Sequence, residues 1–369
     1  MVSKPTVLFI LHMPPPVHGA SMMGKYIHDS KLVNETFDCH YINLTTAKDL
    51  ADIGKVGFRK LMQFWNLLRH IRQEVKRLKP QLVYVTPNAC GGAFYKDFVV
   101  IQMLKRMGCK VVAHYHNKGV STRQDRKLDN WLYRRYFKGI WVMLLAEPLY
   151  ADMQKYVMRE QVLICPNGIP QTPEQVEEAV RRNEKPHLLF LSNLLIAKGV
   201  LVLLDACKLL KEQGYDFQCD FVGGETADMD ATRFADECRK KGIADYVQYH
   251  GRKYGEEKMA FFQQATIFVL PTFNECFPLV LLEAMEQGLP CISSAVGGTP
   301  EIVDEGETGF LVPCREVEPL AERIGQLLND KALRELMGRA GQEKFQEKYT
   351  LQAFERNFAV CLSACFKHS

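Results

Sequence analysis

The sequence predicts two α/β domains, each a doubly wound parallel sheet covered by helices on both faces. Its 369 residues exceed what one hydrophobic core usually holds, and 47% of them are apolar. Apolar runs of strand length alternate with amphipathic runs, and the alternation pauses near residue 170 and restarts near residue 186. Continuous apolar strands that alternate with helices are typical of parallel sheets buried on both faces.

The first series of elements defines a predicted N-terminal domain at residues 1–172. The amphipathic segment 58–78 is expected to be one of its helices, because apolar residues recur in it at helical spacing. Five apolar runs are expected to be its strands: 6–11, 81–86, 110–116, 140–146 and 162–167.

The second series defines a predicted C-terminal domain at residues 186–345. A segment with three prolines and many charges, 169–186, separates it from the first and is expected to be a linker. The pattern after about Asp330 is helical, and we expect residues 346–369 to form a helix that packs back toward the first domain. Five runs are expected to be strands: 187–193, 216–224, 246–251, 265–272 and 290–295.

Composition narrows the class of protein. The longest clean apolar run, 139–146, is far shorter than the roughly 20 residues that span a bilayer. The run TVLFILHM near the N-terminus is followed by three prolines and is expected to be a strand, not a signal peptide. The twelve cysteines form no C-x-x-C pair. We therefore expect reduced thiols, a cytoplasmic location, and neither disulfides nor a metal framework.

Charge is distributed unevenly along the chain. Residues 1–172 contain 25 Lys and Arg against 12 Asp and Glu, whereas the rest contains 22 against 31. A basic half is expected to meet an anionic partner, although uneven solvation of two surfaces is the alternative explanation. Nucleic acid is not expected, since the basic stretches carry no recognised nucleic-acid-binding motif and the second half is acidic.

The stretch NECFPLVLLEAMEQGLP, residues 274–290, carries Glu275 and Glu283 around the start of a predicted helix. Pro278 is expected in the first turn of that helix. The amides of Leu279 and Val280 would then form an anion site that the helix dipole reinforces. A nucleotide diphosphate sugar would use every one of these groups: its diphosphate would bind to the amides, one acid would bind the ribose hydroxyls, and the other acid would bind a sugar hydroxyl. A capping acid and a solvated acid are the structural alternative.

Other loops that follow predicted strands carry residues suited to ligand binding, and parallel sheets bind ligands at the carboxyl ends of their strands. Lys198 stands at a predicted helix entrance and is a point charge for phosphate. Gly297 and Gly298 are expected to allow close approach of a ligand. Asp228-Met229-Asp230 has a spacing that metal sites use, but acids there also suit a helix N-terminus, and we expect no metal.

The order of these motifs resembles that of retaining glycosyltransferases of family 4. The resemblance is dense over residues 187–312 and looser in PPPVHGAS (14–21), VVAHYHN (111–117) and CPNGIP (165–170). It implies the GT-B architecture, in which two Rossmann-like domains face a central cleft, and a nucleotide-activated sugar as donor.

Several roles follow from the resemblance alone. Glu283 would hold the ribose, and Glu275 would lie near the donor sugar and the phosphates. The distal phosphate would be bound by the amides of Phe277, Leu279 and Val280, and Lys198 would neutralise the diphosphate.

The resemblance also assigns residues of the first half. Gly19, after His18, would let the backbone approach the diphosphate. His116 would be the active-site histidine beside the transferred sugar, and its physical case is independent, since a histidine that ends a buried strand can hydrogen-bond a sugar hydroxyl. A structural histidine is the alternative, and His114 competes for the assignment because it lies on the same strand face.

The sequence departs from the family at Asn193, where family members usually have an arginine. Either Lys198 carries the diphosphate largely alone, or a nearby cation such as Arg252 or Lys253 takes the place of the arginine.

The resulting expectation is a metal-independent hexosyltransferase without a cofactor. It would move a sugar, with a UDP-sugar favoured as donor, to a glycan or lipid-linked glycan at the cytoplasmic membrane face. The basic, aromatic-rich segments 58–80 and 121–139 suit an anionic membrane surface, although burial of their aromatic residues against a sheet is the alternative. A non-catalytic nucleotide-sugar-binding subunit and a GT-B epimerase are the alternative functions.

Overall fold

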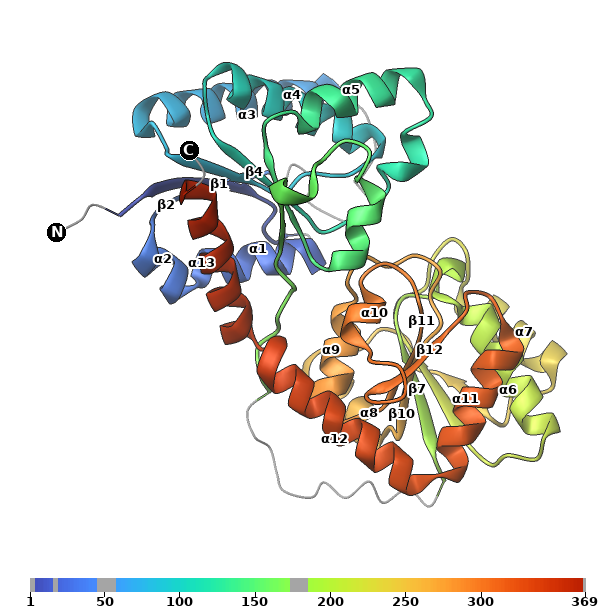
Figure 1. Cartoon of the computed structure of the whole chain (residues 1–369). Coiled ribbons are helices and arrows are strands. Elements are labelled where there is room, and N and C mark those ends of the chain that lie inside the picture. Colours follow the sequence, from blue (N-terminus) through green and yellow to red (C-terminus); the bar gives the residue numbers. More distant parts are fainter. Residues whose placement is uncertain (1–3, 16–18, 45–57, 173–184, 368–369) are drawn as a thin grey trace. The chain divides into compact units, whose positions relative to one another are not determined.

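The computed structural model describes residues 4–15, 19–44, 58–172 and 185–367 and divides into two compact units (Figure 1). Unit 1 comprises Met1–Gly168 and Leu351–Ser369, and unit 2 comprises Ile169–Thr350. The sequence placed these boundaries at residues 172 and 345. Most of the predicted linker, residues 173–184, lies outside the described residues. The two chain segments at the boundaries of unit 2 are hydrogen-bonded to each other: the Ile169 amide donates to the Tyr349 carbonyl over 3.0 Å.

Unit 1 contains a parallel sheet whose described strands run in the order β2-β1-β3-β4-β5-β6. The order reverses beside β1, where β2 lies on one side and β3 on the other. The strands are β1 (Thr6–Leu11), β2 (Asp38–Asn43), β3 (Leu82–Val85), β4 (Val111–Tyr115), β5 (Trp141–Leu144) and β6 (Val162–Ile164).

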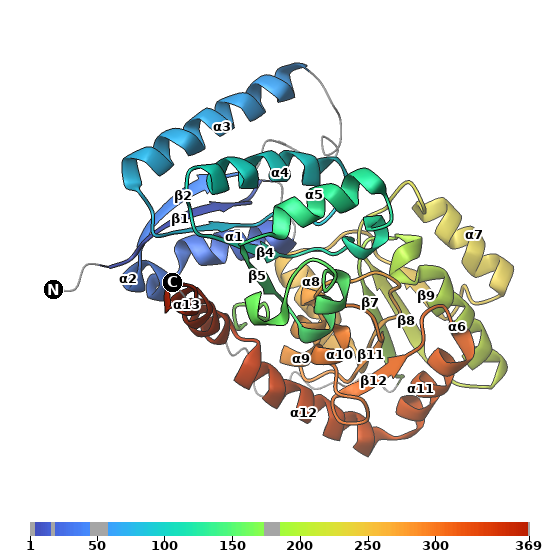
Figure 2. The ribbon, with the colours of Figure 1, turned by 45° about the horizontal axis from the view of Figure 1, so that its top comes forward.

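Helices cover both faces of this sheet. Figures 1 and 2 show α3, α4 and α5 on one face and α1, α2 and α13 on the other. The predicted helix 58–78 is confirmed as α3. The helices are α1 (Gly19–Asp29), α2 (Lys31–Thr36), α3 (Phe58–Leu78), α4 (Gly91–Arg106), α5 (Lys127–Phe137) and α13 (Leu351–Lys367).

The C-terminal helix α13 is part of the hydrophobic core of unit 1. Its Phe358 is fully buried and meets the Tyr84 ring at a centroid distance of 5.2 Å and the His114 ring at 6.3 Å. Phe354 and Leu362 of the same helix belong to the same core cluster. The first sheet therefore depends on residues from the far end of the chain for one of its covered faces.

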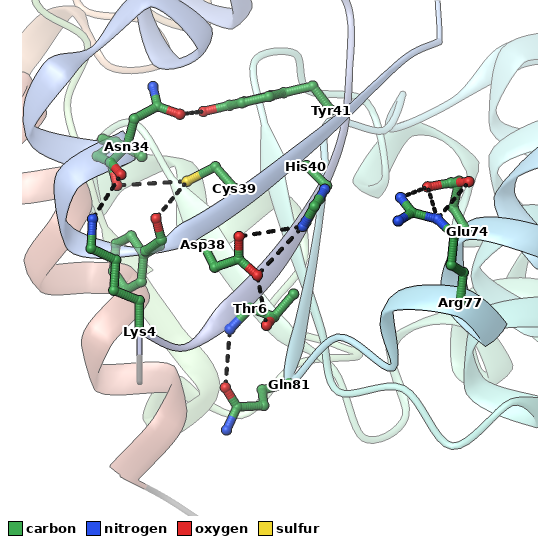
Figure 3. Close-up of polar contacts among 12 residues, drawn as sticks. Lys4, Thr6, Asn34, Asp38, Cys39, His40, Tyr41, Glu74, Arg77 and Gln81 are labelled. Atoms are coloured by element: carbon green, nitrogen blue, oxygen red, sulfur yellow. Dashed lines mark hydrogen bonds and ion pairs between the residues drawn. The ribbon is translucent and has the colours of Figure 1, made fainter. Parts of the chain in front are cut away.

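Strand β2 was not predicted from the sequence. It lies at the edge of the sheet, and Ile42 is the only fully buried residue among its six. Polar contacts hold its outer side chains (Figure 3): the Thr6 hydroxyl donates to Asp38 over 3.0 Å, and the Tyr41 hydroxyl donates to Asn34 over 3.0 Å. Edge strands with a solvated side carry polar residues, so β2 lacks the apolar run by which the other strands were recognised.

Unit 2 contains a second parallel sheet, with described strands in the order β12-β11-β10-β7-β8-β9. The five predicted strands are confirmed with shorter ends, whereas the edge strand β12 was missed because it is a short run after a loop. The strands are β7 (His187–Leu191), β8 (Gln218–Val222), β9 (Val247–Tyr249), β10 (Ile267–Leu270), β11 (Cys291–Ser294) and β12 (Gly309–Val312).

The helices of unit 2 complete an α/β architecture, and the predicted fold class of two parallel sheets with covering helices is confirmed. Within the described residues, none of the helices combines the length and the apolar character that crossing a membrane requires. The helices are α6 (Val200–Glu212), α7 (Ala231–Lys241), α8 (Gly255–Gln264), α9 (Leu279–Glu286), α10 (Thr299–Ile302), α11 (Val317–Asn329) and α12 (Lys331–Lys348).

Candidate functional site

The candidate site of unit 2 lies where the strand order reverses, between β7 and β10. Ligands of doubly wound sheets bind at the carboxyl ends of the strands at such a point. The loops that leave β7 and β10 pack closely there, since the Phe273 amide donates to the Ala197 carbonyl over 2.9 Å. Gly199 has a φ of +83°, and a Cβ on it would lie 2.0 Å from the Pro271 carbonyl oxygen. Only glycine therefore lets the two loops approach this closely.

This loop packing brings together two residues that the sequence singled out. Lys198 ends a 3₁₀ turn after β7, and Glu275 lies in the loop after β10. The Lys198 ammonium and the Glu275 carboxylate form an ion pair. The two side chains are 24% and 12% exposed, so each charge has lost much of its water and gains from the partner.

Gly297 and Gly298 serve the loop of Glu275. Gly297 has a φ of +58°, and a Cβ on it would lie 2.0 Å from the Glu275 carbonyl oxygen. The Gly298 amide donates to the Cys276 carbonyl over 2.7 Å. Gly297 therefore makes room for the backbone that carries Glu275, and Gly298 is hydrogen-bonded to the same loop. The close approach of a ligand to the two glycines stays a prediction.

Helix α9 begins one residue later than expected. Pro278 is the N-cap residue and does not lie in the first turn, and no side chain caps the helix. The first amides of a helix have no acceptor within it, so those of Leu279 and Val280 are oriented toward an outside anion. Phe277 precedes them, and its ring packs against that of Tyr349 at a centroid distance of 5.9 Å.

Glu283 lies in the second turn of α9 and is paired with a lysine that the sequence analysis did not single out. Lys258 of α8 donates to Glu283 Oε1 over 2.8 Å. The other oxygen, Oε2, is buried and accepts no hydrogen bond within the described part of the chain. A buried acceptor without a donor is costly, so Oε2 is a ready partner for a ligand hydroxyl. Lys258 stands 25 residues before Glu283, and no sequence pattern couples the two.

Asn193, the departure from the family pattern, lies beside a cation. Its Oδ1 accepts a hydrogen bond of 3.0 Å from the Gly224 amide. A Cβ on Gly224 would lie 2.3 Å from Nη2 of Arg252, so the guanidinium packs against the same glycine. The loops after β7, β8 and β9 thus bring Asn193 and Arg252 to one place.

The two aspartates of Asp228-Met229-Asp230 have partners of their own. Asp230 is the N-cap of α7 and accepts from the Arg233 amide over 2.8 Å, which confirms the predicted helix-capping role. Asp228 accepts from the Ile196 amide over 3.3 Å and so supports the turn that carries Lys198. No group of three or more His, Cys, Asp or Glu residues suited to a metal ion occurs in the part of the chain that the structure describes.

In unit 1, the structure separates the roles of the two neighbouring histidines. His114 in β4 is fully buried, and its Nδ1 lies 2.8 Å from the Tyr84 hydroxyl. Burial and the adjacent His116 ring, at a centroid distance of 4.3 Å, hold the pKa of His114 well below its ordinary value. His116 is half-buried and follows β4 at the carboxyl edge of the sheet. His114 is thus a core histidine, whereas the ligand role of His116 stays a prediction.

The loop after His116 is fixed by an aspartate that the sequence analysis missed. Asp152 accepts hydrogen bonds from the amides of Gly119, Val120 and Ser121 over 2.8, 3.0 and 3.0 Å, and from the Ser121 hydroxyl over 2.6 Å. Four bonds to one carboxylate hold this loop beside the strand end. Asp152 is more than thirty residues from the loop, so its role has no local sequence signal.

Gly19 is the first residue of α1, the helix that follows β1 in the sheet of unit 1. Residues 16–18, which include His18, lie outside the described residues. Helix α1 lies tightly against the chain that leaves β1, because a Cβ on Gly24 would lie 1.9 Å from the His12 carbonyl oxygen.

Solved structures share this fold. A UDP complex of HepE from Anabaena has a TM-score of 0.75 at 16% identity and covers 97% of this chain and 100% of that chain. Sucrose-phosphate synthase from Thermosynechococcus elongatus has a TM-score of 0.74 at 19% identity and covers 99% and 100%. The chain therefore has the GT-B fold of these proteins.

Sequence comparison agrees with the fold. Residues 171–344 match the family described as glycosyl transferases group 1. The putative colanic acid biosynthesis glycosyltransferase WcaL of Salmonella typhimurium is 26% identical over 264 residues, which are 69% of this chain and 64% of that protein. The capsular polysaccharide biosynthesis glycosyltransferase CapM of Staphylococcus aureus is 28% identical over 194 residues, 50% of each chain. The match covers most of the second unit, which therefore resembles the glycosyl transferases group 1 family.

Proposed function

We propose that the chain is a retaining glycosyltransferase of family 4 that moves a hexosyl group from a nucleotide diphosphate sugar to a glycan or lipid-linked glycan. The observation that carries the proposal is the pair of Lys–Glu contacts around the uncapped N-terminus of α9, at the switch point of the second sheet. A UDP-sugar is the favoured donor, and the UDP complex of the structural neighbour HepE supports that choice.

Each donor group has a counterpart in unit 2. A ribose hydroxyl donates to the buried Oε2 of Glu283, which lacks a donor in the described structure. The distal phosphate accepts from the amides of Phe277, Leu279 and Val280. Lys198 exchanges its partner Glu275 for the diphosphate, because a diphosphate with two negative charges attracts an ammonium more strongly than one carboxylate does. Glu275 is then released toward the sugar.

Transfer breaks the bond between the anomeric carbon and the distal phosphate oxygen. The acceptor hydroxyl oxygen bonds to the same face of that carbon, and its proton passes to the leaving diphosphate. Lys198, the α9 amides and Arg252 stabilise the charge that grows on the leaving oxygens, so the proposed reaction uses no metal and no cofactor. His116 holds a hydroxyl of the transferred sugar.

A non-catalytic subunit that binds nucleotide sugars is the second candidate, and Asn193 in place of an arginine favours it. The two candidates separate in one experiment. The chain is given a panel of UDP- and GDP-sugars, and thermal shift and release of nucleoside diphosphate are measured together. A ligand at 100 times its Kd raises stability by about 2.7 kcal/mol. A thermal shift together with donor-dependent release of nucleoside diphosphate supports the enzyme. A thermal shift without such release, whichever acceptor is added, supports the binding subunit. The absence of a thermal shift with every donor opposes both candidates.

A further inference from the structure

Exposed large apolar side chains gather on one face of unit 1. Of the twelve that the described residues contain, seven lie on α3, α4 and α5: Leu61, Met62, Trp65, Tyr95, Val99, Leu128 and Trp131. These three helices lie side by side over one face of the sheet, as both ribbon views show (Figures 1 and 2). We call their exposed surface the outer helical face.

Along α3 the exposed residues form one stripe. At about 100° per residue, Leu61, Trp65, Arg69, Arg72 and Lys76 fall within a sector of roughly 80°. Leu61 and Trp65 are 65% and 64% exposed, whereas Ile71 and Val75 on the sheet side are buried. The stripe is therefore apolar in its first turns and basic in its later turns.

Helices α4 and α5 repeat this order. On α4, Tyr95 and Val99 precede the exposed Arg106 on the same side of the helix. On α5, Trp131 precedes Arg135, whose guanidinium lies 4.2 Å from the Trp131 ring centroid.

Contacts between α4 and α5 show that these two stripes are neighbours. The Tyr95 hydroxyl donates to Asp129 over 2.7 Å, and Gln102 donates to the Arg135 carbonyl over 3.3 Å. The two helices are thus hydrogen-bonded to each other beside the exposed residues.

The strand order gives the stripes a common direction. Each of the three helices connects parallel strands, so it runs back across the sheet and begins at the carboxyl edge of the strands. The exposed apolar side chains therefore lie toward the edge that carries His116, together with Lys96 and Lys127, and the other exposed Lys and Arg side chains lie toward the opposite edge. A band of apolar side chains therefore borders the sheet edge that carries His116.

The charge of the outer helical face is of one sign. Its acids are Glu74, which pairs with Arg77 over 2.5 Å, and the buried Asp97 and Asp129. Nine Lys and Arg side chains of these helices are exposed in the described structure: Arg69, Arg72, Lys76, Arg77, Lys96, Arg106, Lys127, Arg134 and Arg135.

We propose that the outer helical face docks on an anionic lipid bilayer. Tryptophan, leucine and methionine in the first turns enter the boundary between headgroups and acyl chains, and the basic turns lie against anionic headgroups. Such docking would place the carboxyl edge of the first sheet at the membrane, where a lipid-linked acceptor presents its sugar. The acceptor's position rests on the proposed function, whereas docking itself does not.

Flotation with vesicles tests the docking without any donor. The full chain is mixed with vesicles of phosphatidylcholine alone, or of equal parts phosphatidylcholine and phosphatidylglycerol, at about 0.1 M and about 1 M salt. The Debye length falls from about 10 Å to about 3 Å over this range. We expect binding to the anionic vesicles at low salt and at least a tenfold loss at high salt.

Two variants test the apolar and the basic residues of the outer helical face separately. An apolar variant combines Leu61→Ser with Trp65→Ser, and a charge variant combines Arg72→Glu, Lys76→Glu and Arg134→Glu. Each basic residue near an anionic surface contributes about a fivefold gain in affinity, so the charge variant should lose about 100-fold. The apolar variant should lose about tenfold, because buried apolar area drives the insertion.

Matched controls lie on α12 in unit 2, where Leu336 is 59% exposed. They are Leu336→Ser alone and the exposed triple Lys331→Glu, Arg339→Glu and Lys348→Glu. Thermal unfolding identifies any variant that fails to fold.

Loss of vesicle binding in folded stripe variants, with controls that still bind, supports the proposal. Three results would overturn it: wild-type chain that stays unbound on anionic vesicles at low salt, equal binding to both vesicle types, or equal losses in stripe and control variants. UDP binding, measured separately, reports on the proposed function alone.

Discussion

The Lys198 ammonium and the Glu275 carboxylate pair with each other across the carboxyl ends of the neighbouring strands β7 and β10. Each is the predicted partner of a different part of the donor. In the proposed function, an entering diphosphate displaces Glu275 from Lys198, and the same step frees the carboxylate next to the sugar. The ion pair keeps both charges compensated until the ligand arrives.

Replacing Glu275 with glutamine separates its two effects. Glu275→Gln removes the carboxylate that competes for Lys198, so UDP should bind as tightly as in the wild type or up to about 1 kcal/mol more tightly. Release of UDP from a UDP-sugar should fall, because the group beside the sugar is lost. Calorimetry and a coupled release assay measure the two effects, with exposed Glu307→Gln as control. Markedly weaker UDP binding would show that Glu275 does not oppose the phosphates.

Lys258 is predicted to orient Glu283 for the ribose. Lys258→Met leaves the Glu283 carboxylate partly buried and without its cation, since both side chains are 24% exposed. Uridine affinity should fall by about 1–2 kcal/mol, the scale of a charge-assisted hydrogen bond. Lys208→Met provides the control, because Lys208 and Glu212 form a more exposed pair at 3.7 Å. If Lys258→Met and Lys208→Met bind uridine with equal affinity, Lys258 does not orient Glu283 for the ribose.

Two glycines with positive φ separate two effects of an added Cβ: strain in the glycine's own backbone, and displacement of the loop that carries Glu275. Gly306 has a φ of +79° with open space around it, whereas Gly297, at +58°, faces the Glu275 carbonyl. Gly306→Ala should cost about 1 kcal/mol of unfolding free energy, from the left-handed backbone alone. Gly297→Ala should cost more and should also weaken UDP binding, because the loop of Glu275 must move. The prediction fails if UDP affinity is unchanged in a folded Gly297→Ala variant.

Asp97 makes the stability of unit 1 depend on pH. It accepts from the Asn88 amide over 2.7 Å, and burial raises its pKa to about 6 from an ordinary 3.8. As pH falls through about 6, the folded state takes up a proton that the unfolded chain does not yet bind, so this group favours the folded state increasingly from about pH 7.5 to about pH 5. Asp97→Asn should remove about 1–2 kcal/mol of this gain. Denaturant unfolding of wild type and variant at both pH values measures this difference. The same pH dependence in the two proteins would contradict the assignment.

The sequence was sufficient for most of the fold because buried parallel strands are continuous apolar runs. It failed at β2, an edge strand whose residues are mostly not buried, and at β12, a run of four residues after a loop. Lys198 and Glu275 were recognised for the same topological reason: each follows a buried strand, and parallel strands end at one edge.

The contacts that orient the site residues were beyond the sequence. Lys258 with Glu283 and Asp152 with Gly119 are pairings between distant segments, set by how loops and helices pack. Gly297 shows the same limit in another way. A glycine at this position indicated a close approach, but only the structure shows that the nearest atoms belong to the loop of Glu275.

The most direct test of the central claim is a calorimetric titration of wild type and Lys198→Met with uridine, UMP and UDP. In the wild type we expect affinity to rise from uridine to UDP, because Lys198 and the α9 amides meet the phosphates. In Lys198→Met we expect uridine affinity to be kept and the gain due to the diphosphate to fall by about 1.5–3 kcal/mol. Equal losses for uridine and UDP, or no rise in affinity from uridine to UDP in the wild type, would contradict a nucleotide-diphosphate site at the junction of β7 and β10.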